Sequence, residues 1–125
     1  MRSKTFGILL TMLCCCVARP AVAVEPVPDW LIGTWTPVSD EDGTPPDFAD
    51  FTADGTYVNR GFDCSIRVEM PFHIHNGDIY ITFEVPDKGP VALVFRPDPD
   101  GKRLTYTSPR TRNNAIMEKT QPKCD

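Results

Sequence analysis

Histidine is scarce in this chain of 125 residues, and its cysteines are not spaced like metal ligands. The two histidines, His73 and His75, fall on one face of a predicted strand, about 7 Å apart, with Asp78 expected opposite His75. The pattern supplies no third and fourth ligand, so we interpret both histidines as exposed polar residues and only as weak metal candidates. Cys64 and Cys124 are too far apart in the sequence for a zinc motif. No cofactor is expected.

Motifs for nucleophilic catalysis are also missing. Beyond residue 23 the only serines are Ser39, Ser65 and Ser108, and none lies in a G-x-S-x-G nucleophile motif. Carboxylates are numerous, but no pair of them has a distinctive spacing. The sequence therefore favours a protein that is not an enzyme.

No apolar run in the sequence is long enough to cross a membrane. The longest, Thr5–Ala18, has fourteen residues, whereas a spanning helix needs about 20. It follows a short basic start and precedes Ala21-Val22-Ala23, which together form the pattern of a secretory signal peptide. We predict that residues 1–23 are removed and that residues 24–125 form one periplasmic or secreted domain without a membrane span.

Cleavage would leave two of the five cysteines, Cys64 and Cys124. An even count in an oxidising compartment predicts a disulfide between them. In the chain-entropy model, closing so long a loop stabilises the fold by about 4 kcal/mol. That is a large share of the free energy of unfolding of a whole domain, which is typically about 5–15 kcal/mol. A small domain buries relatively little of its surface, so the added stability matters more to it.

Positive charge is in deficit. Without the first 23 residues, ten basic residues face 17 acidic ones, so the overall field attracts neither nucleic acid nor an anionic membrane. The segment Glu25–Asp54 has eight acidic residues and no basic one, whereas Arg96–Lys123 has seven basic and three acidic residues. Such polarity suits a protein partner of complementary charge, and it is equally consistent with simple solubility.

No stretch beyond the signal has a helical period. Thirteen prolines and repeated Asp-Gly and Asn-Gly pairs divide the chain into short alternating segments, which predicts antiparallel β structure. Asn76-Gly77 favours a type I′ hairpin, and the register that this turn sets brings apolar residues together on one face. The predicted pairs are Ile74–Ile79, Phe72–Ile81, Met70–Phe83 and Val68–Val85.

About eight strands are expected in all, joined in sequence order by short turns. Apart from the Asn76-Gly77 hairpin, they are predicted at residues 32–38, 48–52, 56–62, 91–96, 103–108 and 115–120. A meander of this kind removes its unpaired edges by closing into a small barrel. We therefore predict an all-β barrel with one disulfide, with a β-sandwich as the alternative.

Gly33-Thr34-Trp35, at the start of the first predicted strand, resembles the G-x-W that opens lipocalins and fatty-acid-binding proteins, which are calycin-type barrels. The resemblance covers about ten residues and is closest to the small lipocalin-like domains of exported bacterial proteins. It implies that Trp35 closes one barrel end and that a late arginine, Arg110 or Arg112, packs across its ring. The chain is shorter than most family members, and a narrow eight-stranded barrel can be filled by its own side chains.

Two functional hypotheses follow. The first is an exported, non-catalytic binding protein that acts on another protein, as inhibitors and toxin-immunity proteins do. The missing catalytic motifs, the disulfide and the uneven charge favour it. The second, implied by Gly33-Thr34-Trp35, is a lipocalin-like carrier of a small apolar ligand, and it requires a pocket of about 300 Å³ or more.

Overall fold

A computed structural model describes residues 25–43 and 45–124. The predicted signal peptide, residues 1–23, lies outside the described residues. Within the described part the chain forms nine β-strands. They are β1 (Gly33–Asp40), β2 (Phe48–Phe51), β3 (Thr56–Arg60), β4 (Ile66–Pro71), β5 (His73–His75), β6 (Asp78–Val85), β7 (Gly89–Pro97), β8 (Arg103–Thr107) and β9 (Asn114–Thr120). The same residues contain no helix with the length and apolarity to cross a bilayer.

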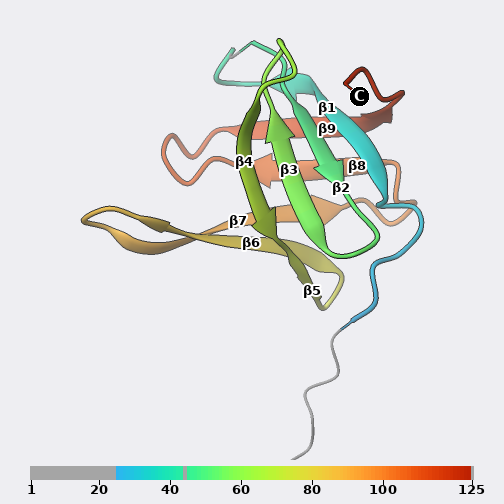
Figure 1. Cartoon of the computed structure of the whole chain (residues 1–125), viewed down its shortest axis with the longest axis horizontal. Coiled ribbons are helices and arrows are strands. Elements are labelled where there is room, and N and C mark those ends of the chain that lie inside the picture. The colour runs from blue at the N-terminus through green and yellow to red at the C-terminus, as the bar shows by residue number, and fades with distance from the viewer. Residues whose placement is uncertain (1–24, 44, 125) are drawn as a thin grey trace, which may run out of the picture.

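The strands form a single antiparallel sheet in the order β4-β3-β2-β1-β9-β8-β7-β6-β5. In Figure 1, β2, β3 and β4 lie in front and cross steeply over β7, β8 and β9 behind them, as in an orthogonal barrel. The two strands at the ends of this order, β4 and β5, follow each other directly in the chain, so the sheet nearly closes on itself. The predicted all-β meander barrel is confirmed, with nine strands instead of eight, and the two-sheet sandwich is not formed.

The Asn76-Gly77 turn forms as predicted. Both residues have positive φ, 51° for Asn76 and 83° for Gly77, as a type I′ turn requires. The register next to the turn is also the predicted one. The observed pairs are Ile74–Ile79, His73–Tyr80 and His75–Asp78.

The predicted continuation of this hairpin is wrong. At Phe72 the chain bends, and the single long arm expected from the sequence becomes two strands, β4 and β5. The Phe72 amide donates a hydrogen bond to Gly55 O (2.8 Å), and its ring packs edge-on against Phe51, with 5.3 Å between centroids. These contacts hold β4 beside β3, so the predicted Phe72–Ile81, Met70–Phe83 and Val68–Val85 pairs do not form. The edge of β4 and the edge of β6 beyond Tyr80 therefore form no backbone pairing with each other.

Aromatic rings fill the barrel core. Phe51 is buried at the centre, with ring centroids 5.4 Å from Tyr57, 5.3 Å from Phe72 and 5.6 Å from Phe95. Tilted and edge-to-face arrangements such as these are the favoured geometries for aromatic pairs. The cluster joins β2 and β3 in the front layer to β7 in the back layer, so it holds the two layers together.

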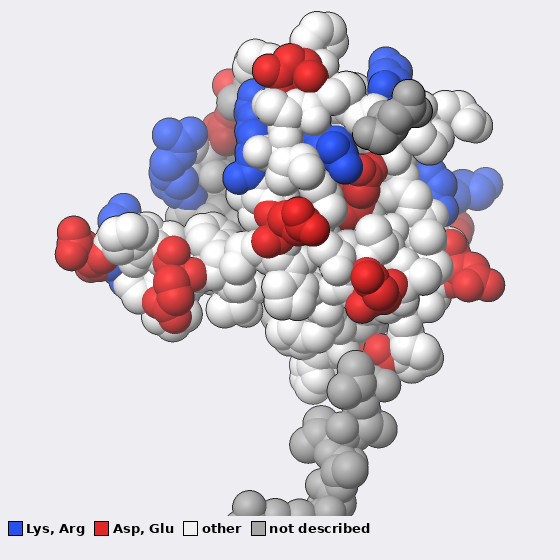
Figure 2. Space-filling model, viewed as in Figure 1, with Lys and Arg blue, Asp and Glu red and all other residues white. Residues whose placement is uncertain are grey.

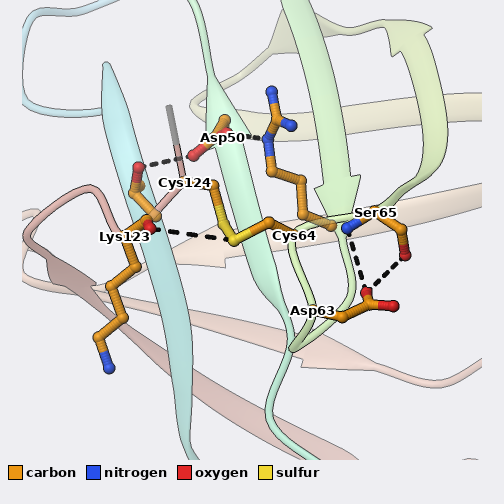
Figure 3. The surroundings of a disulfide bond; sticks show 8 residues. Asp50, Asp63, Cys64, Ser65, Lys123 and Cys124 are labelled. Carbon is orange, nitrogen blue, oxygen red and sulfur yellow. Dashed lines mark hydrogen bonds and ion pairs between the residues drawn. A yellow bond between two sulfur atoms is a disulfide. The ribbon is translucent and has the colours of Figure 1, made fainter.

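The predicted disulfide is confirmed. Cys64, in the turn between β3 and β4, bonds to Cys124 beyond β9, with 5.6 Å between Cα atoms and a sequence separation of 60. Figure 3 shows the surrounding contacts: Ser65 donates two hydrogen bonds to Asp63 from its amide and hydroxyl groups, which fixes the turn. Lys123 O lies 3.9 Å from Cys64 Sγ, a packing contact because a disulfide sulfur carries no hydrogen. The disulfide therefore links the C-terminal segment to the turn between β3 and β4.

The acidic and basic segments of the sequence lie next to each other in the fold. β1, from the acidic segment, lies alongside β9, from the basic segment. Figure 2 shows acidic and basic side chains intermixed on the face in view. One argument for a protein partner of complementary charge is therefore weaker in the folded molecule than in the sequence.

Candidate ligand-binding cavity

Trp35 is buried at one end of the barrel. Its indole Nε1 donates a hydrogen bond to Leu31 O (2.9 Å), and its ring stands edge-on to Trp30, with 6.4 Å between centroids. Lys119 Nζ lies 5.6 Å from the centroid of the Trp35 ring, within cation–π range. The side chain of Trp35 is fully buried.

The cation over Trp35 is Lys119, not Arg110 or Arg112. Lys119 lies directly opposite Trp35 in the register of β1 with β9, so its side chain reaches the ring from the neighbouring strand. The two arginines belong to the loop between β8 and β9, which joins those strands at their other ends. Arg110 lines the cavity described next, and Arg112 lies beside a separate groove formed with β7 and β8.

A cavity of about 450 Å³ occupies the other end of the barrel. β1 runs from Gly33 to Asp40, and the rise along it from Trp35 to Asp40, five positions later, is roughly 16 Å at the usual strand rise. Pro37 and Asp40 line the cavity and Trp35 does not, so the cavity lies toward the end of this strand and Trp35 toward its start. The apolar walls come from inward-facing residues of β3, β4 and β6–β9. They include Tyr57, Met70, Phe83, Phe95, Tyr106 and Met117.

The cavity exists because β4 and β6 diverge. Val68 of β4 and Phe83 of β6 line it from either side of the unpaired edges. Val68 is 37% exposed and Ile66, two residues earlier on the same strand, is 55% exposed. In Figure 1 the β6–β7 hairpin extends away from β4. The apolar interior is therefore open to solvent along this side.

A second hollow, of about 700 Å³, lies outside the barrel beside Trp30. It is the larger of the two, but it is a shallow surface depression. Its lining is mainly charged, with Asp98, Lys102, Arg103 and Glu118 among its residues. Because ligand sites are generally concave and mostly apolar, the interior cavity is the better candidate for a binding site.

Two tyrosines give the cavity polar groups that stay neutral. The Phe95 ring stacks on the Tyr106 ring with 5.3 Å between centroids, and its centroid lies 5.9 Å from that of Tyr57. Burial raises the pKa of the Tyr57 hydroxyl, and the negative charge of Asp47 raises it further. Burial also raises the pKa of Tyr106, with smaller contributions from Asp42 and Asp47. Both hydroxyls therefore remain protonated and can donate hydrogen bonds to a ligand.

Polar side chains form the rim of the cavity. Asp42, in the loop after β1, accepts hydrogen bonds from Thr111 Oγ1 (2.9 Å) and Asn113 Nδ2 (2.7 Å) of the β8–β9 loop. Asp47, just before β2, accepts one from Asn59 Nδ2 of β3 (2.7 Å). These bonds hold three separate segments together around the opening.

Sequence reasoning assigned no role to these rim residues. Nothing in the sequence places residues 39–47 beside residues 108–113. The predicted barrel closure was the one signal that could have located these residues. If β1 and β9 pair as antiparallel neighbours, the loop after β1 must lie next to the loop before β9.

The predicted histidine pair lies on the outer surface. His73 stacks on Tyr80 with 5.4 Å between ring centroids, and His75 meets the same ring edge-on at 6.3 Å. Asp78 lies opposite His75 as predicted, and its carboxylate is 3.8 Å from Arg96. No group of three or more potential metal ligands occurs among the residues that the structure describes.

Comparison with known proteins adds no family assignment: no protein-family model, curated protein or solved structure matches this chain.

Proposed function

We propose that this protein is a lipocalin-like carrier that binds one small, mainly apolar molecule in the barrel cavity. The observation that carries the proposal is the cavity itself, whose volume of about 450 Å³ falls within the roughly 300–1,000 Å³ of typical ligand sites. Its walls are aromatic and aliphatic, with a few polar groups at one end, as such sites usually are. A barrel filled by its own side chains would have argued against a carrier.

The cavity volume limits the size of the ligand. At about 30 Å³ for each water molecule, 450 Å³ corresponds to roughly 15 water molecules. We therefore expect a ligand with on the order of 15 non-hydrogen atoms inside the barrel. Burial of about ten methylene groups contributes about 8 kcal/mol, which corresponds to a Kd on the order of 1 µM before the cost of ordering the ligand.

The binding test uses a neutral apolar fluorophore, N-phenyl-1-naphthylamine, titrated with the purified mature protein. We expect a saturable rise in fluorescence with one site per chain. Ala115 is buried and lines the cavity, so Ala115→Phe should fill part of the space and weaken binding at least tenfold. Ala92→Phe, the same change on an exposed residue of β7 that is not part of the cavity lining, is the matched control. Equal affinity in both variants, or no saturable binding to the wild type, would count against the carrier function.

We further propose that the carrier works outside the cytoplasm after cleavage behind Ala23. The support is the Cys64–Cys124 disulfide, because such bonds persist in oxidising compartments. The intact mass of the protein isolated from its native host should correspond to residues 24–125 with no free thiol. A mass that includes residues 1–23, or alkylation of two thiols, would contradict this location.

A second candidate function, binding of a protein partner, has one specific observation in its favour. β4 is an end strand of the sheet order, and its neighbourhood exposes apolar side chains, including Ile66 at 55% and Phe62 at 71%. An unpaired edge with apolar side chains can receive an extended segment of another protein as an added strand. We therefore propose that the partner protein binds through an extended segment in which apolar residues alternate with polar ones.

The partner hypothesis can be tested with matched lysine substitutions. Ile66→Lys places a charge on the β4 edge, whereas Val38→Lys changes an apolar residue of β1 that is 54% exposed. A partner identified from the native host and then purified should bind the wild type and the Val38 variant, and should lose at least tenfold in affinity for the Ile66 variant. Equal binding to all three proteins would exclude β4 as the docking edge.

A further inference from the structure

We propose that the cavity selects a positively charged ligand, namely a small apolar molecule that ends in an ammonium group. This inference rests on the carrier function proposed above and specifies the class of ligand. The charged residues that line the cavity are three aspartates, Asp40, Asp42 and Asp47, and one arginine, Arg110. All four lie at the polar end, whereas the walls further inside are apolar.

Two of the rim carboxylates have only neutral partners among the described residues. Asp42 is bonded to a hydroxyl and an amide group, and Asp47 is bonded to one amide group. No described lysine or arginine forms an ion pair with either. An ionised carboxylate offers about four acceptor positions, so both keep capacity for a charged donor. Each is half-buried, which strengthens its interaction with a ligand charge compared with a fully exposed group.

Arg110 does not cancel this negative field. Its side chain is exposed, whereas the aspartates are half-buried, so solvent screens the positive charge more than the negative ones. Arg110 also makes no ion pair with Asp42 or Asp47 within the described part of the chain. The opening of the cavity therefore favours a cation over an anion.

The aromatic walls favour the same class of ligand as the carboxylates. Tyr57 and Tyr106 both line the cavity, and tyrosine faces attract ammonium groups through the ring quadrupole. The negative field also reaches these rings, since the charges of Asp42, Asp47 and Asp40 contribute to raising the pKa of Tyr106. A carboxylate rim around aromatic walls is therefore suited to an ammonium head group with an apolar body.

The test compares three decyl compounds that differ only in their head groups: decylammonium, decan-1-ol and decanoate, each below its aggregation concentration at pH 7. Displacement of N-phenyl-1-naphthylamine reports their affinities for the wild type. With up to about fivefold from each of two half-buried ion pairs, we expect decylammonium to bind about tenfold more tightly than decanoate. The preference should shrink at high salt, because salt screens the rim charges.

Variants identify the source of the preference. Asp42→Asn combined with Asp47→Asn should bring the affinities of decylammonium and decanoate to within about twofold and leave that of decan-1-ol unchanged, which shows that the cavity is intact. Asp87→Asn, in the exposed turn between β6 and β7, is the control and should keep the tenfold preference. Equal affinities in the wild type, tighter binding of decanoate, or a preference that survives the double variant would overturn the inference while the carrier function stands. If none of the three compounds binds and N-phenyl-1-naphthylamine does not bind either, the carrier function itself fails.

Discussion

Replacing Cys64 and Cys124 with alanine should lower the free energy of unfolding by about 4 kcal/mol. The bond joins residues separated by 60 positions, and the chain-entropy model gives about 4.3 kcal/mol for a loop of that length at 25 °C. The bond connects the turn after β3 to the segment after β9, so its loss also frees the C-terminal end of the chain. At about 4–8 °C for each kcal/mol in a domain of this size, the unfolding midpoint should fall by roughly 16–32 °C.

Urea titrations followed by circular dichroism measure this effect directly, with the wild type under oxidising and reducing conditions and the double variant under oxidising conditions. The reduced wild type and the double variant should lose similar amounts of stability, because both lack the same cross-link. A loss of less than about 1 kcal/mol in both would contradict this estimate. It would show that the closed loop does not limit the unfolded chain.

Three other perturbations test the fold. Phe51→Ala removes the ring at the centre of the aromatic cluster and should cost about 3–5 kcal/mol in urea unfolding; a cost below 1 kcal/mol would mean that the core lies elsewhere. Gly77→Ala places a side chain at a φ of 83° and should cost about 1–2 kcal/mol, while an unchanged midpoint would contradict the turn geometry. Burial raises the pKa of Tyr57 above its ordinary value of 10.0, so the unfolded state releases this proton first. Stability should therefore fall as pH rises above 10, and Tyr57→Phe should reduce the slope by about 1.4 kcal/mol per pH unit; an identical slope in both proteins would show that the hydroxyl is not buried.

Local chemistry made part of the fold predictable. Asn76-Gly77 has the φ preferences of a type I′ turn, and that turn sets the pairing of Ile74 with Ile79 without help from the rest of the chain. The disulfide follows from there being only two cysteines beyond the predicted signal. Trp35 could be placed at a barrel end by resemblance to a short motif.

The remaining features depend on contacts between distant segments. The chain bends at Phe72 because Gly55 O accepts its amide hydrogen and Phe51 packs against its ring, and neither partner is evident from the hairpin sequence. Without that bend β4 would continue along β6, and the side of the barrel would close. Lys119 lies over Trp35 because β1 pairs with β9, and that pairing also brings the loop containing Asp42 to the loop containing Asn113.

The two methionines beyond the predicted signal report on whether a ligand occupies the barrel cavity. The chain has four methionines, and cleavage after Ala23 leaves Met70 and Met117, which both line the cavity. In protein labelled with ¹³C at the methionine methyl groups, a titration with N-phenyl-1-naphthylamine should therefore shift both signals, saturably and with one common Kd. If neither methyl signal shifts while the protein stays folded and the fluorophore binds, the ligand lies outside the barrel and the cavity is not the binding site.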